Sequence, residues 1–387
     1  MHESIRLGRI RGIAIGLHWS VLAIAALLAW GLADGFLPDQ APGYRGREYW
    51  IVGVVGMLAF FATLLAHELG HSFAARRRGV VVESITLWLF GGVARLRGEA
   101  RTPGGEMTIA VAGPAVSLAG LVGFGALALA LDGRAPDIVV VALAWLAVLN
   151  GMLVVFNLVP AAPLDGGRIL HSIVWAVTHD HDRATRVATT AGKVFGYVLI
   201  AAGVVMLVLG DLGGAWFMLI GWFVIGAAGA EATHALLMSA LAGIRVRDVM
   251  TADPICIHDS VPVDQVIDDV LLSRHWSTFP VVDDAGATTG LLTLRRIRAV
   301  PPDARARVLA GDVAIPLATT PVVGPDDSMA DVLAHSDPDA PGDGRMLVFD
   351  GARLVGIVSP TDVNRALGLA SLRSERPGGA PAGGTDA

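Results

Sequence analysis

The sequence predicts a polytopic α-helical membrane protein with a soluble α/β module at its C-terminal end. Of its 387 residues, 53% are hydrophobic and only 17% are charged, and the mean hydropathy is +0.60. In soluble domains about a quarter of the residues are charged. Long apolar segments occupy the first part of the chain, and from about Ile244 the composition changes to a soluble α/β pattern that occurs twice.

Six apolar segments approach the roughly 20 residues that a membrane-spanning helix requires. The N-terminal residues lack the small-residue cleavage pattern of a signal peptide and lead straight into an apolar stretch, so we expect that stretch to be retained as the first membrane helix. The segments lie near residues 17–36, 50–75, 107–131, 138–160, 193–210 and 214–235.

Arginines cluster at alternate ends of these segments, and this distribution predicts their orientation. Connections on the cytoplasmic side are enriched in Lys and Arg, whereas the connections around 37–49, 132–137 and 211–213 carry fewer cations. An even number of crossings then makes both termini cytoplasmic. The arginines concerned are Arg6, Arg9 and Arg11 before the first segment, Arg76, Arg77 and Arg78 after the second, Arg95, Arg97 and Arg101 before the third, and Arg168 after the fourth.

Charge and cysteine content exclude some classes of function. The net charge of -6 gives no support to a nucleic-acid partner. Cys256 is the single cysteine, so an intramolecular disulfide and a four-cysteine zinc site are both excluded. We expect Cys256 to be an inert thiol in the core of the soluble module.

Ionisable residues interrupt the second apolar segment, in "FATLLAHELGHSFAARRRG". His67 and His71 are four residues apart, so on a helix they share one face and can direct their nitrogens at one zinc ion. Glu68, on the adjacent strip, can reach a zinc-bound water. In the alternative interpretation the histidines only hydrogen-bond to neighbours, but burying three such groups in an apolar helix is costly and usually marks function.

A third ligand is expected because catalytic zinc usually keeps three protein ligands and one open position. Asp165, in "NLVPAAPLDGGRIL", follows a membrane segment broken by Pro160 and Pro163. Prolines at membrane depth unwind a helix, and the predicted topology places Asp165 at the depth of His67 and His71. The sequence therefore predicts one zinc ion per chain. Such an ion lowers the pKa of a bound water molecule, whose proton Glu68 can accept and transfer.

The soluble part reads as an internal repeat whose halves pack together. Each half has a short strand, an acidic turn, a helix, and two strands around a turn, "FPVVDDAGATTGLLT" in the first and "MLVFDGARLVGIVS" in the second. We expect a membrane domain over 1–243, repeat units over 244–300 and 301–370, and a disordered Gly/Pro/Ala-rich tail over 371–387.

Together these motifs resemble the site-2 protease family of intramembrane zinc metalloproteases. "HELGH" and "NLVPAAPLDGG" carry the resemblance, and "GIAIGLHWS", "LFGGVARL" and "AGPAVSL" resemble further family features. The repeat resembles a pair of CBS domains, as in the bacterial subgroup with cytoplasmic CBS modules. The chain departs from the family at Ala162, where many members have a second proline, and at Ser117, where many have asparagine. Both departures affect the expected substrate positioning rather than metal binding.

The resemblance implies that His67, His71 and Asp165 bind zinc and that Glu68 is the catalytic acid/base. It also implies an endopeptidase that cuts a transmembrane segment of a membrane-anchored regulator, such as an anti-sigma factor, within the lipid bilayer. The alternatives are a membrane transporter or receptor gated by the CBS pair, with histidines lining an ion path, and an inactive scaffold.

Other residues have two interpretations each. Asn157 is thought in the family to hold substrate or the oxyanion, but an amide in an apolar helix can equally join helices. Gly91 and Gly92 in "LFGGVARL" fit an edge strand to which an unwound substrate adds, or a plain re-entrant loop. His18 either approaches the site or makes an interfacial hydrogen bond.

The second CBS-like unit carries a candidate nucleotide site in "GIVSPTD". There Ser359, Thr361 and Asp362 match the position at which the family holds an adenosine ribose through the aspartate. Arg296 occupies the corresponding position of the first unit. At most one complete site for an adenine nucleotide is therefore expected, and a purely dimerising role, giving a homodimer, is the alternative.

Overall fold

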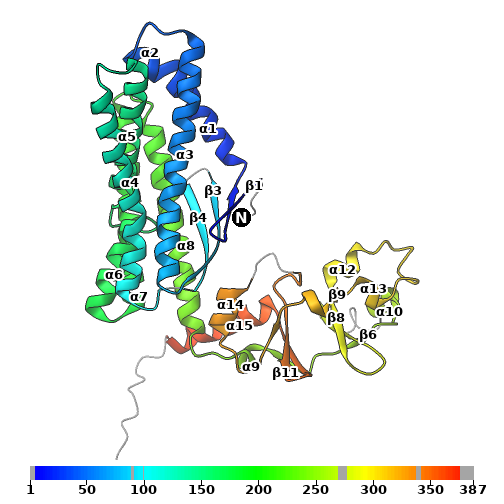
Figure 1. Cartoon of the computed structure of the whole chain (residues 1–387). Coiled ribbons are helices and arrows are strands. Elements are labelled where there is room, and N and C mark those ends of the chain that lie inside the picture. Colours follow the sequence, from blue (N-terminus) through cyan, green and yellow to red (C-terminus); the bar gives the residue numbers. More distant parts are fainter. Residues whose placement is uncertain (1–4, 89–90, 99, 269–276, 337–340, 375–387) are drawn as a thin grey trace, which may run out of the picture. The chain divides into compact units, whose positions relative to one another are not determined.

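The computed structural model describes residues 5–88, 91–98, 100–268, 277–336 and 341–374 (Figure 1). These residues form two compact units, residues 1–235 and residues 236–387.

The first unit contains the membrane helices. Six helical segments are long and apolar enough to span a membrane, as the sequence predicts, and the chain is a multi-pass membrane protein. The first segment combines α1, a π-helical turn over Gly31–Phe36, and α2. The helices are α1 (Ser20–Trp30), α2 (Leu37–Gln40), α3 (Gly46–Arg77), α4 (Pro103–Leu131), α5 (Asp137–Asn157), α6 (Asp165–Thr178), α7 (His181–Val208) and α8 (Gly214–Leu241).

Small residues let these helices approach closely. An added Cβ at Gly203 of α7 would lie 2.5 Å from the backbone oxygen of Gly214 in α8, and one at Gly53 of α3 would lie 2.9 Å from the Cβ of Ala33. Helices in a bilayer gain no hydrophobic free energy by associating, so close packing of this kind is a main source of their association.

A four-stranded sheet accompanies the helices, and the sequence analysis anticipated only its strand in "LFGGVARL". The strands are ordered β1 (Ile5–Ile10), β2 (Ile13–Leu17), β3 (Val81–Trp88) and β4 (Gly91–Arg97), with β2 and β3 parallel. The chain therefore does not lead straight from its N-terminus into a membrane helix. Arg11 and Gly12 both have positive φ, 48° and 88°, and join β1 to β2 in the two-residue hairpin that such angles favour.

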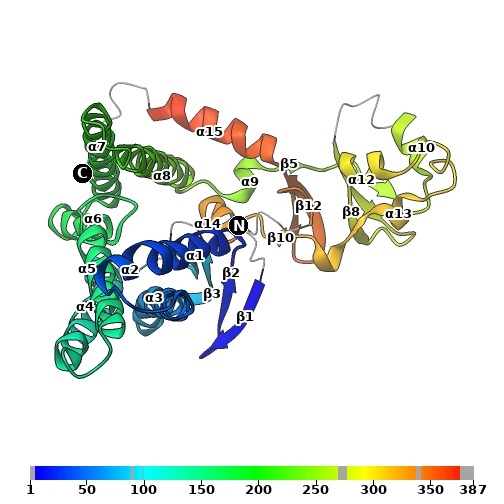
Figure 2. The same ribbon diagram turned by 90° about the horizontal axis from the view of Figure 1, so that it is seen from above.

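The sheet lies against α3 and brings β4 to one edge (Figure 1, Figure 2). Ile13, Ile85 and Leu87 are buried in a cluster to which α3 contributes Leu65 and Leu69. In the described part of the chain β4 pairs only with β3. The "GGVARLR" segment is thus an edge strand rather than a plain loop.

The second unit consists of two sheets that exchange strands. One has the order β6-β7-β8-β9 and the other β10-β11-β12-β5. The short strand β5 begins the first repeat but pairs with β12 of the second, and β9 begins the second repeat but pairs with β8 of the first. The strands are β5 (Thr251–Ala252), β6 (Ile257–His258), β7 (Thr278–Val282), β8 (Thr288–Thr293), β9 (Ile315–Pro316), β10 (Val322–Val323), β11 (Met346–Asp350) and β12 (Arg353–Val358).

Short helices cover these sheets and complete their cores. Phe279, Leu292 and Ile297 are buried in the first half, and Met329, Val348 and Val358 in the second. Cys256 is exposed, so the expected core thiol is wrong. The helix α15 continues through Ser374, into the range expected to be a tail, and residues 375–387 lie outside the described residues. The helices are α9 (Val246–Val249), α10 (Val263–Val266), α12 (Leu294–Ala299), α13 (Ala310–Val313), α14 (Met329–His335) and α15 (Pro360–Ser374).

Candidate metal centre

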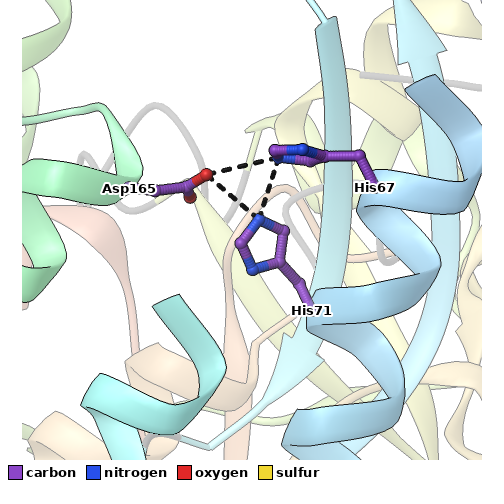
Figure 3. Close-up of side chains that lie close together, drawn as sticks. All are labelled: His67, His71 and Asp165. Carbon is purple, nitrogen blue, oxygen red and sulfur yellow. Dashed lines mark hydrogen bonds and ion pairs between the residues drawn. The ribbon is translucent and has the colours of Figure 1, made fainter. Parts of the chain in front are cut away.

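The helices α3 and α6 bring the three residues expected to bind metal to one point (Figure 3). The Nε2 atoms of His67 and His71 lie 3.1 Å apart, and each is 3.2 Å from Oδ2 of Asp165. Among the described residues this is the one group of three or more His, Cys, Asp or Glu side chains whose ligand atoms converge in this way. Ninety-four positions of sequence separate His71 from Asp165.

The spacing of these atoms fits a zinc ion. Zinc in a tetrahedral site has bonds of about 2.0–2.2 Å, which place its ligand atoms roughly 3.3–3.5 Å apart. The observed 3.1–3.2 Å triangle matches one face of such a tetrahedron and leaves its fourth corner open. Catalytic zinc sites have this arrangement.

Gly113 of α4 provides the space that an ion requires. An added Cβ at this position would lie 2.1 Å from Nε2 of His71 and 2.6 Å from Nε2 of His67. The first value is near a metal–ligand bond length, and both are far below a non-bonded contact of about 3.5 Å. A glycine in "AGPAVSL" therefore keeps the volume in front of the two imidazoles free of side chain.

The other nitrogen of each imidazole is held by α4. Nδ1 of His71 donates to the backbone oxygen of Ile109 at 2.7 Å, since a carbonyl oxygen only accepts. Nδ1 of His67 lies 2.9 Å from Oγ of Ser117, which can accept a hydrogen bond from the Nδ1–H group. With Nδ1 protonated, each Nε2 presents a lone pair to the site, as metal-binding histidines do.

Asp165 supplies the negative charge of the site. Burial by itself would raise its pKa, but in the metal-free site hydrogen bonds from protonated imidazoles of His67 and His71 outweigh burial and lower that pKa from 3.8 to about 2. With both Nε2 atoms deprotonated, two imidazole lone pairs and a carboxylate converge on one point and favour a shared cation there. A divalent metal is such a cation.

A non-helical segment orients Asp165. The helix α5 ends at Asn157, and α6 begins at Asp165 itself. Between them the backbone N–H of Ala162 donates to the backbone oxygen of Ala188 in α7, at 3.1 Å. Proline has no N–H, so the alanine at this departure from the family pattern makes a bond that the more usual residue could not.

The two glycines after Asp165 allow α6 to lie directly on that segment. An added Cβ at Gly166 would lie 2.2 Å from the backbone oxygen of Val159, and one at Gly167 would lie 2.4 Å from the backbone nitrogen of Ala162. In "LDGG" the carboxylate points at the metal position while the glycines fix the helix that carries it.

Glu68 lies beside the edge strand. An added Cβ at Gly92 of β4 would come within 2.3 Å of Cγ of Glu68, so Gly92 leaves room for the glutamate. Of the other residues singled out from the sequence, Asn157 is half-buried at the end of α5. His18 does not join the metal group: its backbone N–H donates to Leu87, and Nδ1 bonds with Oγ of Ser20.

The sequence analysis related the departure at Ser117 to substrate positioning rather than to metal binding. In the structure the Ser117 hydroxyl contacts a candidate metal ligand, His67, so the residue bears on the metal centre as well. The only sequence signal for this role is its spacing of four residues from Gly113 on one face of α4.

Asp362 in the second unit is buried and already has partners. Its carboxylate accepts bonds from Oγ of Ser359 at 2.6 Å, from Oγ1 of Thr251 at 3.1 Å and from Arg365 at 2.6 Å. Thr361 is exposed. At the equivalent place of the first unit, the backbone N–H of Arg296 donates to Oγ1 of Thr293 at the start of α12.

Comparison with known proteins gives the family. Residues 55–133 and 125–202 match peptidase family M50, and residues 246–303 match the CBS domain. The chain is 44% identical to Rip3 of Mycobacterium tuberculosis, named as a candidate zinc metalloprotease, over 97% of this chain and 96% of that protein. It is 28% identical to the zinc metalloprotease MJ0392 of Methanocaldococcus jannaschii, over 97% and 99% of the two chains.

A solved structure, the site-2 protease from Methanocaldococcus jannaschii, is 31% identical, covers 59% of this chain and 94% of its own, and has a TM-score of 0.42. The near full-length similarity to Rip3 and the two family matches agree with the motifs, with the membrane helices and with the C-terminal repeat. The chain belongs to peptidase family M50, the site-2 protease family of intramembrane metalloproteases, and carries a C-terminal CBS domain region.

Proposed function

We propose that this protein uses one zinc ion, held by His67, His71 and Asp165, to hydrolyse a peptide bond in a transmembrane segment of a membrane-anchored regulatory protein. The observation that carries the proposal is the triangle of ligand atoms with sides of 3.1–3.2 Å, facing a glycine. An anti-sigma factor is one regulator of this kind.

Glu68 is the proposed acid/base. Zinc, when bound, polarises the peptide carbonyl and lowers the pKa of a water molecule in the open position. Glu68 accepts the proton of that water on a carboxylate oxygen and later delivers it to the leaving amine. Ser117 and the backbone oxygen of Ile109 hold the two imidazoles in the tautomer that the metal requires.

Substrate is proposed to add to β4 as an extended strand. Peptide bonds inside a helix are shielded by hydrogen bonding, so a transmembrane substrate must unwind before it is cut. The edge of β4 offers backbone partners for an unwound segment, and Gly92 lies beside Glu68, whereas an added Cβ at Gly91 would meet nothing within 4 Å. Asn157 is proposed to bind the substrate or the oxyanion from the end of α5.

The proposed topology has both termini in the cytoplasm. The arginine distribution supports it, and residues 1–243 are then the protease domain, with the units 244–300 and 301–370 on the cytoplasmic side. For these units we propose a regulatory role through an adenine nucleotide at Ser359, Thr361 and Asp362, or through a homodimer. The hydrogen bonds that now occupy Asp362 would have to be exchanged for those of a ribose.

The experiment that tests the proposal uses the Glu68→Gln variant as a trap. Glutamine is nearly isosteric but cannot accept the water's proton, so the variant should retain zinc and a bound transmembrane partner that can be identified after purification. Zinc should be lost from the His67→Ala, His71→Ala double variant in elemental analysis. Full zinc in the double variant would overturn the metal assignment, and transport without cleavage would favour the transporter alternative.

A further inference from the structure

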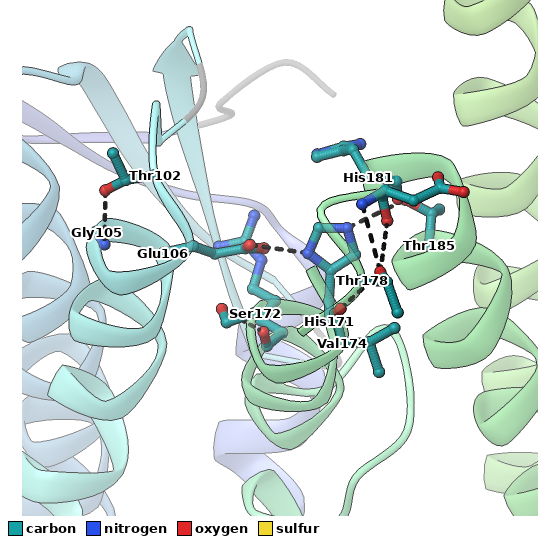
Figure 4. Close-up of polar contacts among 11 residues, drawn as sticks. Thr102, Gly105, Glu106, His171, Ser172, Val174, Thr178, His181 and Thr185 are labelled. Atoms are coloured by element: carbon teal, nitrogen blue, oxygen red, sulfur yellow. Dashed lines mark hydrogen bonds and ion pairs between the residues drawn. The ribbon is translucent and has the colours of Figure 1, made fainter. Parts of the chain in front are cut away.

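A second polar cluster lies where α6 meets α4 and α7, apart from the metal ligands (Figure 4). Nδ1 of His171, on α6, is 2.8 Å from Oε2 of Glu106, on α4. Nε2 of His171 is 3.2 Å from Oγ1 of Thr185, on α7. His171 is only 9% exposed, so the contact is buried between three helices.

The two helices joined by this contact hold different parts of the metal centre. The helix α4 orients both imidazoles, through Ile109 and Ser117. The helix α6 carries Asp165 as its first residue. Glu106 precedes Ile109 by less than one turn, and His171 follows Asp165 by about 9 Å of helix at roughly 1.5 Å per residue.

Zinc tolerates little movement between these helices. Ligand atoms must stay within about 0.2 Å of their bonding distances, and Asp165 reaches the ion from a different helix than the histidines do. A contact that fixes the separation of α4 and α6 near the site therefore acts on zinc affinity directly.

We propose that the Glu106–His171 pair is a positioning contact of the metal centre, which locks α6 to α4 so that Asp165 stays within bonding distance of the zinc held by His67 and His71. The inference rests on the proposed function, because it concerns the same zinc ion.

The charges around His171 make the contact dependent on pH. Burial by itself lowers the pKa of His171, but the hydrogen bond and the negative charge of Glu106 outweigh burial and raise that pKa above its ordinary 6.5. The stabilisation from the Glu106–His171 ion pair is therefore fully present below about pH 6.5, the unfolded-state pKa of a histidine. This stabilisation is lost as the pH rises through the raised folded-state pKa of His171, above which only a neutral hydrogen bond remains.

Each helix packed around His171 contributes groups that face it. Glu106 comes from α4, Thr185 and the ring of His181 from α7, and Glu231, whose charge acts on His171, from α8. Glu106 is the carboxylate that bonds directly to the imidazole, and the charge of Glu231 also interacts with that of Arg168. The ring of Trp175, on α6, also contacts that of His171. Arg168 of α6 and His234 of α8 act on the charge of Glu231.

The test measures the zinc dissociation constant of the purified full-length protein by competition with a fluorescent chelator, between about pH 6 and pH 9. Glu106→Leu removes both charge and acceptor and should weaken zinc binding about tenfold, the lower end for residues outside the ligand shell. Glu106→Gln keeps an acceptor for Nδ1–H, so it should approach wild-type affinity at high pH and fall below it at low pH. The ratio to wild type at each pH cancels the titration of the ligands themselves.

Glu48 provides the matched control, because like Glu106 it lies in the first turn of a membrane helix. Its side chain accepts a hydrogen bond from the backbone N–H of Arg45 and not from a histidine. Glu48→Leu should leave zinc affinity unchanged. Wild-type affinity in Glu106→Leu, or a Glu106→Gln ratio that does not change with pH, would overturn the inference. Absence of bound zinc in the wild-type protein would instead overturn the proposed function, so the two failures are distinguishable.

Discussion

Replacing Gly113 by alanine should abolish tight zinc binding while leaving the fold intact. The added methyl carbon would lie 2.1 Å from Nε2 of His71 and 2.6 Å from Nε2 of His67. Restoring a non-bonded separation of about 3.5 Å requires a shift of roughly 1.4 Å at His71. That shift is several times the tolerance of about 0.2 Å for a ligand atom. We expect a loss of at least about 100-fold in zinc affinity, the upper end of what outer-shell changes cost.

Chelator competition on the purified protein measures this loss, and Gly123→Ala is the matched control. Gly123 lies on the same helix, where an added Cβ would meet nothing within 4 Å, and alanine in place of a helical glycine stabilises by about 0.5–1 kcal/mol. Gly123→Ala should therefore bind zinc as the wild type does. If Gly113→Ala also bound zinc with wild-type affinity, the ion would not occupy the space in front of the two imidazoles, and the assigned centre would be wrong.

Three further predictions concern the chemistry, the outer shell and the topology. Glu68→Gln should keep its zinc and lose about two to four decades of cleavage rate; near-normal cleavage would mean that Glu68 has another role. Ser117→Ala should weaken zinc binding about 10–100-fold by releasing Nδ1 of His67, and unchanged affinity in chelator competition would remove that role. Reporter fusions after Gly243 and within 37–49 should score cytoplasmic and external respectively; an external score after Gly243 would reverse the proposed orientation.

Features set by local composition could be predicted from the sequence. The membrane helices follow from apolar length alone, and "HELGH" defines a metal-binding face because helical geometry fixes the spacing of His67 and His71. The metal triangle itself also depends on Asp165. Its position could be anticipated because two prolines and a shared depth restrict where the chain after α5 can go.

Features that depend on contacts between distant segments could not be predicted. The hairpin of β1 and β2 rests on a two-residue turn at Arg11 and Gly12, inside a stretch whose apolar residues read equally as the start of a helix. The exchange of β5 and β9 between the two repeats could not be predicted from their sequences, because a strand of two residues is too short to show a pattern. The Glu106–His171 contact joins residues 65 positions apart whose spacing follows no motif.

The central claim is that this protein cuts a peptide bond inside a membrane segment with zinc and Glu68. The most direct measurement places the purified protein in proteoliposomes with the partner captured by the Glu68→Gln trap and determines the products by mass spectrometry. The account predicts one cut within the partner's transmembrane segment, abolished by zinc chelation, restored by added zinc, and absent with Glu68→Gln. A cut outside that segment, or one that survives both chelation and the substitution, would contradict it.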